Sequence, residues 1–199
     1  MVSTSKQALR TQLKQQRAAL SPQERAQNDA EIAATLFTST PWQQARAVLP
    51  YLSFGPEVDT RAIIERAWDE GKLIALPRVV NGTRDMHWYE VSSFDGLETS
   101  KLGVDEPRED TAAEVRPAEL CRLLGDQHVL VLVPGLAFDS HGFRMGYGGG
   151  FYDTLLETFS GQTIGLCRDS FFIDELACCE PHDKSVQAVC TQRALHPAQ

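Results

Sequence analysis

The alternation of short apolar runs with helical stretches constrains the fold of this chain more than any other feature of its sequence. The most apolar run, Val129–Val133, has the length of a strand that is buried on both faces of a parallel sheet. Strands separated by helices are typical of an α/β fold, in which helices cover both faces of a mainly parallel sheet. We therefore expect this fold, with ligands bound at the carboxyl ends of the strands.

The same pattern predicts the other elements of the sheet. Strands are expected at 47–52, 73–80, 86–91, 164–167 and 186–191, and helices at 60–70 and 151–159. Asn81-Gly82 predicts a hairpin turn between the strands on either side of it. The acidic stretch 105–119 is expected to be a surface excursion.

Two helices are expected ahead of the first strand. From Lys6 to Leu20 the leucines fall at helical spacing, which predicts an amphipathic helix with a cationic stripe. The stripe consists of Lys6, Arg10, Lys14 and Arg17, and its ordinary interpretation is a solvated face. Ser21-Pro22-Gln23-Glu24 has the pattern of a capping box and predicts a second helix that ends near Phe37. We expect one domain over 1–199, with a helical segment at 1–40 and an α/β body at 46–192.

Composition limits the class of partner. The net charge of −8 argues against a general binder of nucleic acid or of anionic membranes, and no apolar stretch approaches 18 residues. The first residues lack the apolar core of a secretion signal, so we expect a cytoplasmic protein. An odd number of cysteines without a C-x-x-C pair predicts reduced thiols rather than disulfides or a zinc site. They are Cys121, Cys167, Cys178, Cys179 and Cys190.

One loop carries most of the chemical information. Five glycines fall within residues 142–150, between the strand at 129–133 and the helix expected at 151–159. Glycines let consecutive N–H groups converge on one anion, and the positive end of a helix dipole reinforces them. Arg144 adds a cation suited to phosphate oxygens, and Asp153 is placed to hold a magnesium ion. The loop therefore predicts a polyphosphate site, against the alternative of a flexible surface loop, although it matches neither a Walker loop nor a dinucleotide fingerprint.

The segment 142–153, GFRMGYGGGFYD, resembles the signature G-x-R-[LM]-G-x-G-x-G-[YF]-Y-D of the 5-formyltetrahydrofolate cyclo-ligase family. The similarity extends, in order, to Lys6-x-x-x-Arg10, Tyr51-Leu52-Ser53, Glu57-Val58-Asp59-Thr60, Leu76-Pro77-Arg78-Val79, residues 103–107 and His182-Asp183. Two positions depart from the family: Phe151 stands where tyrosine is usual, and Gln192 follows Thr191 where glutamate is common. The resemblance assigns no role to the segment that begins at Thr191-Gln192.

The resemblance implies a reaction and its small-molecule partners. Enzymes of this family use ATP and magnesium to convert 5-formyltetrahydrofolate to 5,10-methenyltetrahydrofolate, with release of ADP and phosphate. Phosphorylation of the formyl oxygen makes an iminophosphate, from which phosphate leaves when the ring closes. The resemblance implies no nucleic-acid, membrane or protein partner.

The resemblance also implies roles for individual residues. ATP would be bound by Lys6, Arg10, Arg144, Gly146, Gly148, Gly149, Gly150 and Asp153, and magnesium by Asp153 and Asp183. Arg144 would neutralise charge during phosphoryl transfer, and Tyr147 would hydrogen-bond the formyl or phosphate oxygen. Folate would be bound by Leu52, Glu57, Met86, Trp88, Tyr147 and Tyr152. Lys14 and Arg17 keep the interpretation of a solvated face, and His87, His141 and His182 receive no role.

Two other classes of function stay open at this point. The glycine loop could belong to a nucleotide or sugar-phosphate sensor without turnover, although the presence of Arg144, Asp153 and Asp183 together favours an enzyme. An ATP-independent isomerase or transferase would need an acid/base carboxylate motif, which is not evident in the sequence. An anionic polyglutamate tail on folate would need a local cation such as Arg78 or Lys101.

Overall fold

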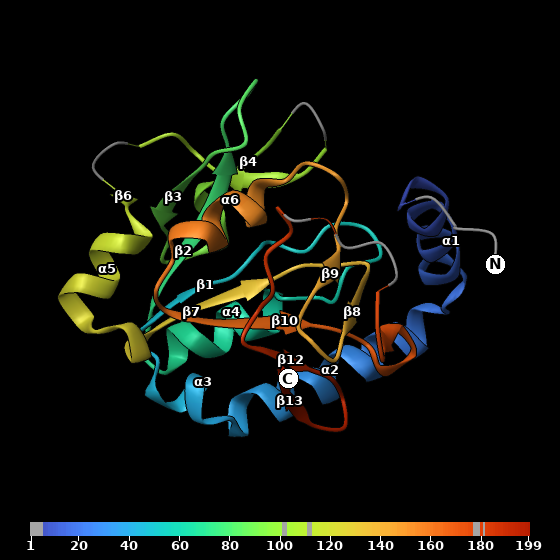
Figure 1. Cartoon of the computed structure of the whole chain (residues 1–199). Helices are drawn as coiled ribbons and strands as arrows, with labels where there is room; N and C mark the ends of the chain where they lie inside the picture. The colour runs from blue at the N-terminus through green and yellow to red at the C-terminus, as the bar shows by residue number, and fades with distance from the viewer. Residues whose placement is uncertain (1–5, 101–102, 111–112, 177–179, 181) are drawn as a thin grey trace.

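A computed structural model describes residues 6–100, 103–110, 113–176, 180 and 182–199 of the chain. Cys178, Cys179 and Lys101 lie outside the described residues. A large, mainly parallel sheet runs through the centre, with helices on both of its faces (Figure 1). The α/β fold expected from the sequence is therefore confirmed.

The central sheet has the order β13-β12-β10-β7-β1-β2-β3-β6. Its strands are β1 (Ala47–Leu49), β2 (Leu73–Val79), β3 (Met86–Glu90), β6 (Glu114–Val115), β7 (Val129–Val133), β10 (Gln162–Leu166), β12 (Ala188–Cys190) and β13 (Leu195–Pro197). The pairs from β12 through β10, β7 and β1 to β2 are parallel, whereas β13, β3 and β6 pair antiparallel at the two edges. The carboxyl ends of five parallel strands thus meet at one edge of the sheet.

Smaller elements surround this sheet. The helices are α1 (Lys6–Ala19), α2 (Pro22–Thr38), α3 (Thr40–Gln44), α4 (Arg61–Asp69), α5 (Pro117–Leu124) and α6 (Phe151–Thr158). Short 3-10 helices are η1 (Phe94–Gly96), η2 (Asp126–His128) and η3 (Asp169–Phe171). Separate small sheets are formed by β11 (Phe172–Ile173), β8 (Ala137–Asp139) and β9 (Arg144–Met145), and by β4 (Leu97–Thr99) and β5 (Asp105–Pro107).

Alternating side chains divide the core into two layers. On one face of the sheet Val48, Leu130 and Leu132 pack with residues of α2, α3 and α4. On the other face Leu49 and Val131 pack with residues of α1, α5 and α6. Because successive side chains of a strand point to opposite faces, the continuous apolar runs serve both layers.

Several predicted boundaries need correction. The strands expected at 164–167 and 186–191 are β10 (Gln162–Leu166) and β12 (Ala188–Cys190). The first strand ends at Leu49 rather than at residue 52, because the Tyr51 carbonyl accepts the Thr60 hydroxyl at 2.7 Å instead of a bond from a neighbouring strand. The acidic stretch 105–119 is not only a surface excursion: it contains β5, β6 and the start of α5. The capping box is present, since Ser21 and Glu24 exchange both expected hydrogen bonds at the start of α2.

Cys121, Cys167 and Cys190 are buried free thiols, and burial raises the pKa of Cys167 and of Cys190 to about 12. Among the described helices, none combines the length and apolarity that a membrane crossing requires.

Candidate active site

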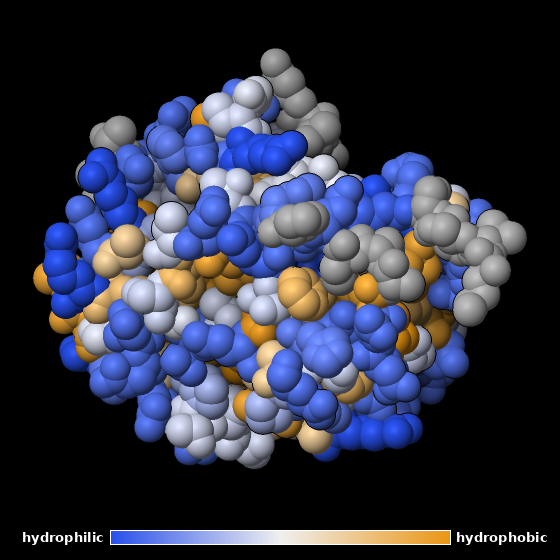
Figure 2. All heavy atoms as spheres, in the orientation of Figure 1, coloured by the Kyte–Doolittle hydropathy of each residue, from blue (hydrophilic) through white to orange (hydrophobic). Residues whose placement is uncertain are grey.

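A cleft of about 550 Å³ lies at the carboxyl ends of the central strands. Residues at the ends of β1, β2 and β7 line it, together with the glycine loop, and α1 contributes Lys6 and Arg10. In Figure 2 the surface is hollowed between α1 and the part of the molecule that carries the β2–β3 hairpin. The cleft is therefore at the edge where open α/β sheets bind their ligands.

The glycine loop forms one wall of the cleft. It leaves β9 and ends at Gly150, which is the N-cap of α6. Gly148 and Gly150 have φ angles of 107° and 75°, a region that favours glycine. Arg10 lies on the loop: its Nε donates to the Gly146 carbonyl at 2.9 Å, and a Cβ at Gly148 would be 3.5 Å from Arg10 Cζ. The loop thus brings backbone, a helix N-terminus and a guanidinium to one place, as a phosphate site requires.

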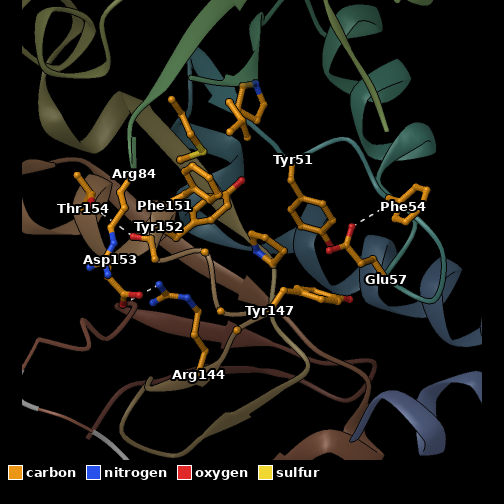
Figure 3. A pocket seen from close by; sticks show the side chains of 18 of the residues that line it. Tyr51, Phe54, Glu57, Arg84, Arg144, Tyr147, Phe151, Tyr152, Asp153 and Thr154 are labelled. Atoms are coloured by element: carbon orange, nitrogen blue, oxygen red, sulfur yellow. Dashed lines mark hydrogen bonds and ion pairs between the residues drawn. The ribbon is translucent and has the colours of Figure 1, made fainter. Parts of the chain in front are cut away.

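Arg144 and Asp153 are fixed against each other beside this loop. Arg144 Nη2 donates to Asp153 Oδ1 at 2.8 Å, and Arg144 Nη1 donates to the Lys184 carbonyl at 2.7 Å. The Lys184 amide also donates to Asp153 Oδ1, at 3.1 Å. These bonds fix the Arg144 guanidinium, whose side chain is mostly buried, at the wall of the cleft (Figure 3).

Lys6 lies at the same end of the cleft and forms ion pairs with two carboxylates. Its Nζ lies 2.6 Å from Glu180 Oε2 and 2.8 Å from Asp183 Oδ2. Burial lowers the pKa of Lys6, but the hydrogen bonds to Asp183 and Glu180 outweigh it and raise the pKa. Burial likewise raises the pKa of Asp183, and the bonds from Lys6 and the Glu180 amide outweigh it, so that this pKa is lowered. Lys6 is therefore a charged group, and an anionic ligand would replace the carboxylates as its partner.

The carboxylates predicted for magnesium fit a hard cation. Asp153 and Asp183 both line the cleft. Asp153 Oδ1 accepts two bonds, whereas Oδ2 accepts none from the residues that the structure describes. Asp183 also lies close to Glu180 and His182, with potential ligand atoms within 4.8 Å of one another. Carboxylate oxygens beside a phosphate cradle are a donor set that suits magnesium.

Glu57 marks the other end of the cleft. Figure 3 shows it beside Tyr51 and Tyr147, across the cleft from Arg144 and Asp153. The Phe54 amide donates to Glu57 Oε2 at 2.9 Å. Burial raises the pKa of Glu57, while the Phe54 amide, the Arg17 charge and the Tyr147 hydroxyl act in the opposite direction. Burial, followed by the negative charge of Glu57, raises the pKa of Tyr147.

Between the two ends the cleft is lined by less polar groups. Leu52, Met86 and Tyr152 all line it, as the sequence predicted for a folate slot. The Tyr152 hydroxyl is buried and has no hydrogen-bond partner among the described residues. A buried hydroxyl without a partner is expected to bind a polar atom of a ligand, because leaving it unsatisfied is unfavourable.

The structure does not bring two expected residues to their predicted places. Trp88 has an exposed fraction of 1% and packs in the core with residues of α5, because its position on β3 points it away from the cleft. Arg17, expected on a solvated face, has the same exposed fraction and donates to backbone carbonyls. Lys14 is exposed, with its Nζ 5.4 Å from the centroid of the Tyr147 ring.

The sequence did not predict several residues at the rim of the cleft. Phe54 and Val79, the last residue of β2, are exposed apolar groups on this rim, and Arg84 reaches it from the β2–β3 hairpin. A Cβ at Gly150 would lie 3.3 Å from Arg84 Cδ, so this arginine rests on the glycine loop. No motif around Arg84 signals the contact, because it joins segments that are far apart in the sequence.

Arg78, which the sequence offered as a cation for an anionic polyglutamate tail on folate, is paired with Glu98 at 2.6 Å.

Comparisons with known proteins agree with the resemblance. The model of the 5-formyltetrahydrofolate cyclo-ligase family matches residues 2–192. The sequence is 31% identical to the 5-formyltetrahydrofolate cyclo-ligase of Escherichia coli (strain K12), covering 90% of this chain and 96% of the relative. It is also 31% identical to that of Mycolicibacterium smegmatis, covering 97% and 96%. The solved structure of Aquifex aeolicus 5,10-methenyltetrahydrofolate synthetase, 24% identical, has the same fold, with a TM-score of 0.79 over 98% of this chain and 93% of that chain.

Proposed function

The chain belongs to the 5-formyltetrahydrofolate cyclo-ligase family, and on that premise we propose that it converts 5-formyltetrahydrofolate to 5,10-methenyltetrahydrofolate with consumption of ATP. One observation carries the proposal: a single cleft has a glycine loop with cations at one end and Glu57 with tyrosines at the other. Such a cleft suits two ligands that meet face to face.

The chemistry requires an activated oxygen. The formyl oxygen of the substrate attacks the γ-phosphorus of ATP, and the bond from that phosphorus to the β-phosphate oxygen breaks, releasing ADP. The N10 amine then attacks the formyl carbon, the carbon–oxygen bond breaks, and phosphate leaves while N10 loses its proton. Positioning and charge neutralisation supply most of the catalysis in phosphoryl transfer.

The residues at the nucleotide end have complementary tasks. Lys6 and Arg10 contact the phosphates from α1, and the amides of Gly146, Gly148, Gly149 and Gly150 donate to phosphate oxygens. Arg144 lies where it can neutralise the charge that develops on the transferred group. Asp153 and Asp183 would hold magnesium, which supplies charge neutralisation to the phosphates when it is bound.

The residues at the folate end orient the acceptor. Glu57 accepts hydrogen bonds from the N–H groups of the reduced pterin, and Leu52 and Met86 contact its flat faces. The Tyr152 hydroxyl, which has no partner among the described residues, donates to a polar atom of the substrate. Tyr147, on the loop between the two ends, bonds the formyl oxygen or the phosphate that it receives.

The proposal is tested optically, because the methenyl product absorbs where the formyl substrate does not. We expect purified protein with 5-formyltetrahydrofolate and magnesium to give this absorbance only when ATP is added, with one ADP released for each product. Binding of magnesium nucleotide without turnover would indicate a sensor instead of an enzyme. Product formation without ATP would contradict the proposed chemistry.

A further inference from the structure

Two buried arginines meet at one carbonyl beneath the folate end of the cleft. The Pro56 carbonyl accepts Arg17 Nε at 3.2 Å, Arg17 Nη2 at 3.0 Å and Arg168 Nη1 at 3.0 Å. Arg168 Nη2 also donates to the Glu57 carbonyl at 2.9 Å. The main chain at Pro56 and Glu57 is thereby held by hydrogen bonds from the two arginines.

The two arginines differ in how their charges are compensated. Arg168 makes a two-pronged pair with Asp29, at 2.7 and 2.8 Å. Arg17 forms no ion pair with any described carboxylate, and its other bonds are to the carbonyls of Gly135 and Leu136, at 3.2 and 3.0 Å. Burying a guanidinium with only neutral partners is costly, so its retention calls for a role.

The position of Arg17 suggests that role. It lies in the last turn of α1, the helix whose first turns carry Lys6 and Arg10 to the nucleotide end of the cleft. Its three backbone partners belong to the loop before Glu57 and to the segment after β7. One helix therefore contacts the nucleotide end directly and the folate end through Arg17.

We infer that Arg17 is a positioning residue for Glu57, which it holds in place through the Pro56 carbonyl as the acceptor for the reduced pterin. The inference rests on the proposed function, since it needs Glu57 to bind folate. Arg168, neutralised by Asp29, fixes the same loop without adding net charge.

The electrostatics of the site support this inference. The charged and titratable groups around Glu57 are Arg17 from α1, the Arg168–Asp29 pair at its carbonyl, and the tyrosines Tyr51, Tyr147 and Tyr152. Of the two cations, Arg17 is the one without a carboxylate partner among the described residues, and it opposes the effect of burial, which raises the pKa of Glu57. Loss of the Arg17 charge should therefore raise the pKa of Glu57 further, and the ionised acceptor would be lost at a higher pH as the pH falls.

Two substitutions at position 17 separate the charge from the geometry. Arg17→Gln removes both, so we expect the KM for 5-formyltetrahydrofolate to rise about tenfold or more and the acid limb of kcat/KM to move up by about one pH unit. Arg17→Lys keeps the charge but not the planar fork of donors. The KM for 5-formyltetrahydrofolate should therefore rise, while the acid limb of kcat/KM should stay at its wild-type pH. In both variants the kcat and the KM for ATP should change less than threefold.

The matched control is Arg46→Gln, which removes an exposed arginine at the amino end of β1 and should leave every parameter unchanged. Circular dichroism and magnesium-nucleotide binding establish that each variant is folded. A folded Arg17→Gln variant with the wild-type KM and acid limb would overturn the inference. If that variant does not fold, Arg17→Lys decides alone, and a wild-type KM for folate in it would equally overturn the inference. Absence of turnover in the wild-type protein would instead refute the proposed function, and the inference with it.

Discussion

Charged side chains of the cleft are held by partners that a ligand would replace. Arg144 is bound to Asp153, and Lys6 to Glu180 and Asp183. Each group is thus held in place before a substrate arrives. Because the groups are preorganised, single substitutions should affect turnover more than folding.

Arg144→Ala tests this expectation at the nucleotide end. We expect kcat to fall by about 100-fold or more, since a positioned cation that stabilises developing charge is worth that much. The melting temperature should change by only a few degrees, because Arg144, on the two-residue strand β9, contributes no apolar packing to either core layer. Steady-state kinetics and thermal unfolding measure the two effects, with Arg116→Ala, at an exposed position just before α5, as the control. Wild-type kcat in the Arg144 variant would remove this residue from the mechanism.

Asp153→Asn tests the magnesium assignment. Asparagine keeps an oxygen that can accept from Arg144 and from the Lys184 amide, but it lacks the charge that a hard cation prefers. We expect the magnesium concentration for half-maximal turnover to rise about tenfold, together with the KM for ATP. Titration of turnover with magnesium at saturating ATP measures the effect. An unchanged titration curve would show that Asp153 is not a ligand.

At the scale of elements, the sequence predicted what depends on local pattern. The buried strand β7, the capping box of α2 and the glycine loop before α6 all lie where the pattern put them. The short strands β8 and β11 were missed, because two or three residues carry no periodicity and their partners lie far along the chain. Arg17 was misassigned for a related reason. Helical spacing shows which cations share a stripe but not which of them a distant loop will cover.

The packing of β10 against β8 gives a prediction at this scale. A Cβ at Gly165 would lie 2.2 Å from Cε1 of Phe138, a side chain with no exposed surface. Gly165→Ala should therefore lower the free energy of unfolding by about 1–3 kcal/mol, as overpacking of a core does. Urea unfolding measures the change. Gly96→Ala is the matched control, because a Cβ there meets nothing within 4 Å. Equal stability of the two variants would show that the ring of Phe138 can move aside.

At the scale of the whole molecule, α1 closes one side of the cleft. It is anchored through Leu13, which is buried in the core, through Arg17, and through the ion pairs of Lys6 with Glu180 and Asp183. A nucleotide bound to Lys6 and Arg10 adds to these contacts, and ligand binding stabilises the state to which the ligand binds.

We therefore expect magnesium nucleotide to slow amide hydrogen exchange across α1 severalfold. Mass spectrometry of exchange with and without nucleotide measures the effect. The amides of α5, on the opposite side of the molecule from α1 (Figure 1), should not respond and serve as the internal control. A response spread equally over α1 and α5 would contradict a specific contact between α1 and the nucleotide.

The contact between α1 and the end of the chain also bears on how the enzyme is made. Lys6 pairs with Glu180 and Asp183, which are 174 and 177 positions further along the chain. On a ribosome, α1 must wait until Glu180 and Asp183 have emerged before it finds these partners. The sheet can assemble progressively, but the phosphate end of the cleft is completed only after translation has passed residue 183.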